Sequence, residues 1–353
     1  MTEEKKVAIW GYYNYGNFGD DLMAVMIGHQ LRANGYAPIV YRLDPIIASE
    51  AGVLSTYSLR ELLNGAHYCI IGGGMFLASE EPNNPASSSI LADLVILKNL
   101  LEELNIPVIG ISIGGSAKGQ NDKISEQMKD LISSSQFKGT TVRLPSDLQL
   151  LSFTKKPVRL HHDIVFTSSK YYDQSSIKTV PDVEVLIHQS NALPNRIIFW
   201  IIAVIGNLLG RRTKFLQTYV DNASPQGAEL GSESSNALKY ESITNILSGL
   251  NKAEVLISSK LHVGVCAVAF GNCFVSLGGT PKTLGFLKTI RRAHFFYPRV
   301  TCKKFIMVGL LVLSRRYRKR MCARFRLGNL SDFTHDAQGH FDFMFDMLSK
   351  TKT

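Results

Sequence analysis

A histidine and two lysines stand shortly after predicted strands in the second half of the sequence. Lys260 and His262 follow the strand predicted over Glu254–Ser258, and Lys282 follows the next strand within a Gly-Gly-Thr-Pro-Lys turn. Lysine side chains bind anions, and histidine ordinarily titrates near neutral pH and can transfer protons. These residue types therefore predict a site that binds an anionic substrate and moves a proton. A purely structural role for His262, as a cap or a packing residue, is the alternative.

Three glycine-containing turns follow predicted strands in the first half of the sequence. Backbone N–H groups at such turns can surround an anion, and a helix dipole adds to the attraction. Glycine also closes tight strand-to-helix turns for purely structural reasons. None of the turns has the Walker A or GxGxxG pattern, so a nucleotide-binding fingerprint is absent. The candidate substrate-binding residues in these turns are Asn17, Gly19, Asp20, Gly72, Gly73, Gly74, Gly115 and Ser116.

Alternating strand and helix patterns in the first half predict the elements that position these turns. Repeated β-α units with apolar strands indicate a parallel sheet covered on both faces. We expect Asp20 or Asp21 to cap the first helix. The predicted strands are Lys6–Tyr13, Ala37–Asp44, His67–Gly73, Pro107–Gly114, Thr140–Leu144 and Val158–Phe166, and the predicted helices are Asp20–Asn34, Ser88–Leu104, Asp122–Ser134 and Ser146–Ser152.

A second β-α series follows and predicts a second α/β domain. Two such domains in tandem predict a cleft that faces the carboxyl ends of both sheets, with Arg143 opposite the lysines. We expect domains at 1–176 and 177–290 and a C-terminal segment at 291–353. The predicted strands are Glu184–Gln189, Lys214–Val220, Glu254–Ser258 and Cys273–Leu277, and the predicted helices are Pro194–Leu209, Tyr240–Leu250 and His262–Phe270.

Composition places the chain among globular proteins of a reducing compartment. Its 353 residues are 45% hydrophobic and 19% charged, which suits two domains with sizeable cores. The charged N-terminal residues run into an apolar stretch that is too short for a secretory signal, so we expect a cytoplasmic protein. The five cysteines show no CxxC pair and no zinc-like spacing. They predict reduced thiols and no metal site.

The net charge of +10 comes from one part of the chain. Residues 291–326 hold 12 Lys/Arg and no Asp/Glu, which leaves 27 basic against 29 acidic residues elsewhere. The apolar run 305–313 within this block spans about 13.5 Å as a helix, less than half of a bilayer core of about 30 Å. Another apolar helix includes Ile197–Ile202. We expect a basic amphipathic segment on an anionic membrane surface; a solvated or packed face is the alternative, and nucleic acid is the least favoured partner.

Two weaker patterns are more often structural than functional. Glu233 and Glu241 have the E-x7-E spacing of some retaining glycosyltransferases, but Glu233 lies in a predicted Ser/Gly-rich loop. The C-terminal group that contains His335 and His340 with two aspartates could bind a metal. We instead expect a solvated terminal stretch in which Phe341 and Phe345 pack locally.

Taken in order, the motifs resemble those of the polysaccharide pyruvyl transferase family. The resemblance is carried by the Gly-aromatic opening with Asn-x-Gly-Asp at Gly11–Asp21, the Gly-Gly-Gly turn at Cys69–Leu77, Gly110–Ser116, Val142-Arg143 with Ser146, His162-Asp163, the Ser-x-x-His of Ser259–His262, and Lys282. The match extends over residues 7–290, and the order and spacing of the motifs together are more specific than any one of them.

The resemblance implies a glycosyltransferase-B-like fold and transfer of the enolpyruvyl group of phosphoenolpyruvate to a sugar, forming a pyruvate ketal on a glycan or its lipid-linked precursor. It implies that Arg143, His262 and Lys282 take part in donor binding and catalysis, that Asp163 belongs to the site, and that no cofactor is needed. The family usually has arginine where this chain has Lys260. Lysine keeps the charge but loses the bidentate fork that suits a carboxylate or phosphate.

Two other functions remain open at this point. A nucleotide-sugar glycosyltransferase could use the same architecture, although the nucleotide fingerprint is absent. A family member without catalysis, which only binds glycan or scaffolds an assembly complex, is the other alternative, and Lys260 is the residue that keeps it open.

Overall fold

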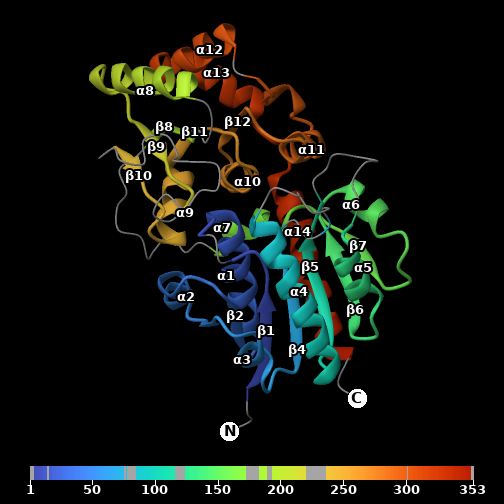
Figure 1. Ribbon diagram of the computed structural model, residues 1–353. Coiled ribbons are helices and arrows are strands. Elements are labelled where there is room, and N and C mark those ends of the chain that lie inside the picture. Colours follow the sequence, from blue (N-terminus) through green and yellow to red (C-terminus); the bar gives the residue numbers. More distant parts are fainter. Residues whose placement is uncertain are drawn as a thin grey trace. The chain divides into compact units, whose positions relative to one another are not determined.

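The computed structural model describes residues 4–13, 16–74, 77, 85–115, 124–171, 183–188, 193–219, 236–299 and 301–350. The chain forms two compact α/β units (Figure 1). The first unit comprises Met1–Gly16, Asp20–Ile164 and His335–Thr353, and the second comprises Asn17–Gly19 and Val165–Thr334. Residues 291–353, which we expected as a segment of their own, are thus shared between the two units.

The first unit is built on a seven-stranded parallel sheet, in the order β3-β2-β1-β4-β5-β6-β7. Its central strands are buried along their whole length, as expected of a parallel sheet covered on both faces. The strands are β1 Lys5–Trp10, β2 Tyr36–Tyr41, β3 Leu54–Thr56, β4 Tyr68–Gly72, β5 Val108–Ile113, β6 Phe137–Val142 and β7 Val158–Leu160.

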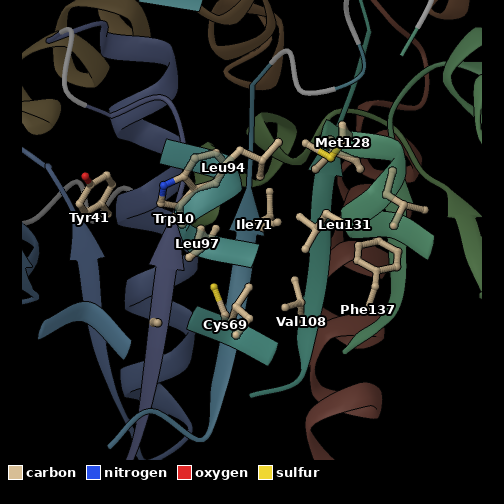
Figure 2. Packing of buried hydrophobic residues seen from close by; sticks show 14 of the residues in the cluster. Trp10, Tyr41, Cys69, Ile71, Leu94, Leu97, Val108, Met128, Leu131 and Phe137 are labelled. Atoms are coloured by element: carbon tan, nitrogen blue, oxygen red, sulfur yellow. The ribbon is translucent and has the colours of Figure 1, made fainter. Parts of the chain in front are cut away.

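Helices connect these strands, and capping residues fix where several of them begin. Asp44, Ser58 and Ser125 each accept hydrogen bonds from backbone N–H groups in the first turn of the following helix. In Figure 2, apolar residues of α4 and α5, among them Leu97 and Leu131, pack over strand residues such as Trp10. The helices are α1 Phe18–Ala33, α2 Pro45–Ala51, α3 Leu59–Leu63, α4 Pro85–Glu103, α5 Glu126–Ser133, α6 Pro145–Leu150 and most of α14 Leu330–Lys350.

Helix α14 replaces the solvated terminal stretch that we predicted, so that prediction was wrong. Its residues from His335 onwards pack on the first unit, where His340 is completely buried and its two ring nitrogens lie 2.7 Å from the Thr141 hydroxyl and 2.8 Å from the His162 carbonyl oxygen. The signal was present in the sequence, because Ala337, Phe341, Met344 and Leu348 recur at helical spacing and are all buried.

The strand predicted over Val158–Phe166 ends early, at Leu160. Beyond it, the backbone N–H and the Nδ1 atom of His162 both lie 2.6 Å from the Asp336 carboxylate of α14. The chain then continues into a short 3₁₀ helix over Ile164–Thr167. Contacts with α14, which the local sequence pattern does not reveal, therefore take these residues away from the sheet.

The second unit has a six-stranded parallel sheet in the order β10-β9-β8-β11-β12-β13. Helices α9 and α10 lie on one face of this sheet, and α8, α12 and α13 lie on the other (Figure 1). The strands are β8 Val183–Ile187, β9 Thr213–Leu216, β10 Ala237–Leu238, β11 Ala253–Ser258, β12 Cys273–Leu277 and β13 Phe296–Tyr297, and the helices are α7 Ser168–Tyr171, α8 Leu193–Leu208, α9 Ile243–Lys252, α10 Leu261–Ala269, α11 Pro281–Thr289, α12 Cys302–Leu313 and α13 Arg315–Phe325.

Part of the basic block 291–326 is structural. The Arg318 guanidinium is completely buried and lies 2.8 Å from a carboxylate oxygen of Glu184 and 2.8 Å from one of Glu254. It also donates hydrogen bonds to the carbonyl oxygens of Leu311 and Val312 at the end of α12. These contacts attach α12 and α13 to the sheet of the second unit. Among the described residues, no helix has both the length and the apolar character needed to span a bilayer.

Candidate functional site

The glycine turn after β4 is tightly built into the first unit. Gly73 and Gly74 have φ angles of +60° and +95°, which glycine adopts without strain. A Cβ atom added to Gly72 would lie 2.6 Å from Ile27 Cδ1, and one added to Gly73 would lie 2.6 Å from Met23 Cε. The Tyr13 hydroxyl donates a hydrogen bond to the carbonyl oxygen of Gly72. Backbone conformation and packing are therefore sufficient to require glycine at these positions.

Arg143 lies at the carboxyl end of β6 and is buried in an ion pair. Its Nη1 atom is 3.2 Å from the Asp163 carboxylate, and the two side chains are only 4% and 6% exposed. Its Nη2 atom also donates to the carbonyl oxygen of Gly74, at 3.4 Å. A Cβ atom at Gly114 would lie 2.8 Å from Arg143 Nε. The structure thus brings together Arg143, Asp163 and two of the three predicted glycine turns.

Asp147, a buried residue of α6 that we did not predict from the sequence, organises the same edge. One of its carboxylate oxygens accepts a hydrogen bond from the backbone N–H of Gly115, at 2.8 Å, and the other accepts one from Leu144, at 3.1 Å. Its position in the first turn of α6 is typical of an acidic capping residue, which is the signal that could have identified it. Ser116, the other predicted residue of this turn, lies outside the described residues.

Residues 17–19 belong to the second unit, where they lie beside the residues that follow β9. The Phe18 N–H donates to the Thr218 carbonyl oxygen, at 2.9 Å, and Asn17 forms an antiparallel bridge with Tyr219. The Asn17 side chain accepts a hydrogen bond from the Gly19 N–H, at 3.4 Å. Helix α1 begins at Phe18, so Asp20 lies inside its first turn and is not the cap that we predicted.

Gly19 and His262 are in direct contact, although they are far apart in the sequence. A Cβ atom on Gly19 would lie 2.1 Å from His262 Nδ1 and 2.7 Å from His262 Cβ. Any other residue at position 19 would therefore displace the imidazole. The predicted site residues of two separate motifs meet here, within one unit.

Lys260 stands at the start of α10, as its N-cap residue, without a side-chain capping bond. Its ammonium group donates to the Tyr219 hydroxyl, at 2.9 Å, and lies 4.3 Å from the centre of the same ring. Its backbone N–H donates to the Ser258 hydroxyl, at 2.9 Å. Lys282 occupies the first turn of α11, directly after Pro281, and is partly buried.

The positions of both lysines oppose the helix dipole. Each stands at the positive end of a helix, where a cation is unfavourable. Lys260 in addition occupies the cap position of α10, where Ser, Thr, Asp or Asn is usual. Helix stability does not explain these lysines. An anion bound near the two helix ends would reverse the unfavourable electrostatics, because it attracts both the ammonium groups and the backbone N–H groups.

His188 is a further polar residue that the sequence analysis missed, because it was included in a predicted strand. It follows β8 and is completely buried, with Nδ1 3.1 Å from the Ser258 hydroxyl and Nε2 3.4 Å from the Thr218 hydroxyl. Thr218 bonds to Phe18, and Ser258 bonds to Lys260. His188 therefore connects the two backbone segments that carry Gly19 and Lys260. Its position at the carboxyl end of an apolar strand was the available signal.

No group of three or more His, Cys, Asp or Glu side chains within the described parts of the chain could hold a metal ion. The five cysteines form no disulfide; Cys69, Cys266 and Cys273 are buried, and burial raises the pKa of Cys69 to about 12. The second unit thus contains a histidine, two lysines and helix N-termini, which are groups that can bind an anion and transfer a proton.

The family model of polysaccharide pyruvyl transferases matches residues 17–280. The chain belongs to this family. The matched range begins at the segment that contacts His262 and ends just before Lys282, so it includes all the other predicted site residues. A polysaccharide pyruvyl transferase is a transferase, which agrees with the class of enzyme predicted from the sequence. A search among curated protein sequences gave no match.

Solved structures with a similar fold include UDP-GlcNAc 2-epimerases and a glycosyltransferase. A UDP-GlcNAc 2-epimerase from Methanocaldococcus jannaschii has a TM-score of 0.57 at 9% identity, with 97% of this chain and 99% of that one covered. A putative UDP-N-acetylglucosamine 2-epimerase from Listeria monocytogenes has 0.56 at 10%, with 97% of both chains covered. The glycosyltransferase SnogD from Streptomyces nogalater has 0.51 at 12%, with coverage of 97% and 99%. These similarities confirm the predicted glycosyltransferase-B-like fold class.

Proposed function

We propose that this polysaccharide pyruvyl transferase uses phosphoenolpyruvate as its donor and forms a pyruvate ketal on a sugar of a lipid-linked glycan, at the cytoplasmic face of a membrane. The family supplies the class of reaction. The observation that carries the proposal is the contact of His262 with Gly19, beside Lys260 and the N-terminus of α10. An imidazole, which can transfer protons, near a lysine and the N–H groups of a helix N-terminus supports the proposal.

In the proposed reaction, one proton is added to the methylene carbon of phosphoenolpyruvate, which makes its C2 atom electrophilic. Two hydroxyl groups of the sugar add to C2, the C2–O bond to phosphate breaks, and phosphate leaves. The two hydroxyl groups release two protons. One of them replaces the proton that was added to the methylene carbon, and the other leaves with phosphate. His262 acts as the acid towards the methylene carbon or as the base towards the attacking hydroxyl, since imidazole can do either.

The donor carries a carboxylate and a phosphate, and we propose that Lys260 and Lys282 bind these groups. Both lysines stand at helix N-termini, where the dipole also attracts an anion. Because cationic side chains and backbone donors can carry out this role, we expect donor binding to persist in the presence of a chelator. A strict requirement for magnesium or manganese would contradict this part of the proposal.

For Arg143 we now propose a positioning role instead of a direct contact with the donor. Its guanidinium is buried, and the Asp163 carboxylate balances its charge. Through Gly74 and Gly114 it fixes the backbone of the two glycine turns. The glycine turns, with Asn17 and Asp20, remain candidates for contacts with the sugar.

Product analysis tests the proposed reaction. Purified protein with phosphoenolpyruvate and a water-soluble oligosaccharide acceptor should release phosphate and give a ketal-modified glycan, whereas a sugar nucleotide should release no nucleotide. The Gly19→Ala variant should lower kcat by about tenfold or more, because the new methyl group displaces His262. Gly328→Ala, at a position with no heavy atom within 4 Å, is the matched control. Nucleotide release in place of phosphate release would overturn the proposal.

A further inference from the structure

Helix α8 presents an apolar stripe to solvent. Phe199, Ala203 and Gly206 face inwards and are buried. The opposite side is exposed and apolar at positions spaced as on one face of a helix, with exposed fractions from 42% at Ile205 to 80% at Leu208. The exposed apolar residues of α8 and of the position just after it are Trp200, Ile201, Ile205, Leu208 and Leu209.

Helix α12 packs beside α8 and has an exposed stripe of its own. Phe305 contacts Phe199 of α8, with ring centres 5.5 Å apart, and a Cβ atom on Gly206 would lie 2.5 Å from Val312. The remaining face of α12 exposes three large apolar residues, Ile306, Leu310 and Leu313, at helical spacing. Contiguous exposed apolar residues of this kind are uncommon on a soluble surface and mark interaction sites.

Basic residues accompany this apolar face. The segments 193–212 and 291–326, which include α8, α12 and α13, hold no Asp or Glu. The exposed basic residues of α13 are Arg315, Arg316, Lys319, Arg320 and Arg324. Arg318 is instead buried in its ion pair with Glu184. Exposed apolar side chains next to an excess of cations are the chemistry that binds an anionic lipid surface.

We propose that α8 and α12 together form the surface through which the second unit inserts into an anionic bilayer, with α13 supplying the cations. The exposed stripe of α8 adjoins a hollow of about 410 Å³ lined by Trp200, Val204, Asn207, Leu208, Phe215 and Asn236, which offers further apolar surface to lipid chains. The proposal refines the membrane attachment of the proposed function, and it holds or fails independently of the reaction.

The structure also determines which experiment is suitable. Met307, Val308, Leu311 and Val312 of α12 are buried, so deletion of the basic block would expose the core of the second unit. Single substitutions at exposed positions avoid this problem. Trp200 is half-exposed on the stripe and Trp10 is completely buried in the first unit, and these are the two tryptophans of the chain.

Fluorescence with vesicles tests the proposal on the full chain. Vesicles of phosphatidylcholine containing phosphatidylglycerol should shift the Trp200 emission to shorter wavelength, while Trp10 gives a constant background. Leu208→Glu should weaken vesicle binding by about 10- to 100-fold, as expected from the loss of one buried leucine. Arg315→Ala should weaken it by about fivefold. Val95→Glu, at an exposed position of α4, is the matched control and should bind as the wild type does.

Three results would overturn the proposal. These are the absence of any shift with anionic vesicles, undiminished binding by Leu208→Glu, and a dimer in solution that Leu208→Glu converts to a monomer while vesicles remain unbound. The last result would assign the face to a second copy of the chain. Phosphate release with a water-soluble acceptor needs no vesicles, so failure of the proposed reaction would be recognised separately.

Discussion

The two sheets carry polar residues at the carboxyl ends of their strands, but the two sets of residues differ in exposure. In the first unit, Arg143 and Asp163 neutralise each other and are almost completely buried. In the second unit, Lys260 and His262 are partly exposed at the start of α10. Burial with a full set of partners favours rigidity, whereas partly exposed groups at a helix N-terminus remain accessible to a substrate.

From this difference in exposure we infer that the family motifs of the two units have different roles. The motifs of the first unit hold the backbone of the glycine turns in place. The motif around His262 supplies groups that can contact a reacting molecule. Substitutions should therefore affect stability in the first unit and turnover in the second.

The largest effect is expected at His262. His262→Ala should lower kcat by about 10²- to 10⁴-fold with little change in the KM for phosphoenolpyruvate, because proton transfer occurs only in the transition state. Phosphate release measures both constants. His29→Ala, at an exposed histidine of α1, is the control. A fully active His262→Ala enzyme would assign His262 to packing against Gly19.

The second largest effect is expected on the stability of the first unit when its buried cation, Arg143, is removed. Arg143→Ala should lower the free energy of unfolding of that unit by about 3–5 kcal/mol, because the buried Asp163 carboxylate loses the cation that neutralises it. Urea unfolding followed by Trp10 emission in a Trp200→Phe background gives the value.

Arg159→Ala provides the comparison for this measurement. Arg159 is 54% exposed and lies 3.9 Å from Asp346, so its loss should cost no more than about 1 kcal/mol. If Arg143→Ala keeps its stability and instead raises the KM for phosphoenolpyruvate, Arg143 contacts the donor, as the sequence first suggested.

A pH effect of intermediate size is expected from His340. Burial, together with repulsion from His161, lowers the pKa of His340 to about 3, whereas an unfolded histidine has a pKa of about 6.5. The unfolded chain therefore takes up a proton first as the pH falls, and stability decreases from pH 6.5 towards pH 3. Between pH 7 and pH 5 the first unit should lose about 2 kcal/mol through this residue.

The same unfolding measurement at the two pH values tests the effect of His340. His340→Gln, which does not titrate, should show a smaller loss than the wild type. The carboxylate of Asp336 responds to pH in the same direction: burial alone would raise its pKa, but hydrogen bonds from His162 outweigh burial and lower it. An equal loss in both proteins would assign the acid sensitivity to groups other than His340.

The smallest effect is expected from the exchange of one cation for another. Lys260→Arg should leave kcat unchanged and the KM for phosphoenolpyruvate equal or lower, because arginine can stack on the Tyr219 ring and bind a carboxylate with two hydrogen bonds. Lys260→Ala should raise KM by about tenfold. Lys288→Ala, an exposed lysine on α11, is the control. Loss of activity in Lys260→Arg would show that the ammonium group itself is required.

The sequence was sufficient to predict the elements that have a strong local pattern. The apolar strands and the periodic helices of both units lie close to their predicted ranges, since burial imposes these patterns along the chain. The contacts between distant residues were not predictable in this way. Nothing in the local sequence indicates that Gly19 meets His262, that His188 joins two segments, or that Asp163 neutralises Arg143, because each depends on the folded arrangement of other elements.

Most of α14 belongs to the first unit although it follows the second unit in the sequence, and this limits the order in which the two units can fold. Asp336 bonds to His162, 174 residues earlier, and the carbonyl oxygen of Leu348 accepts a hydrogen bond from Tyr68. Contacts of such long sequence separation form late. During synthesis, the ribosome must translate the whole second unit before the first can be completed. A nascent chain halted before His335 would expose the apolar surface that α14 covers, and would be a substrate for chaperones and proteases.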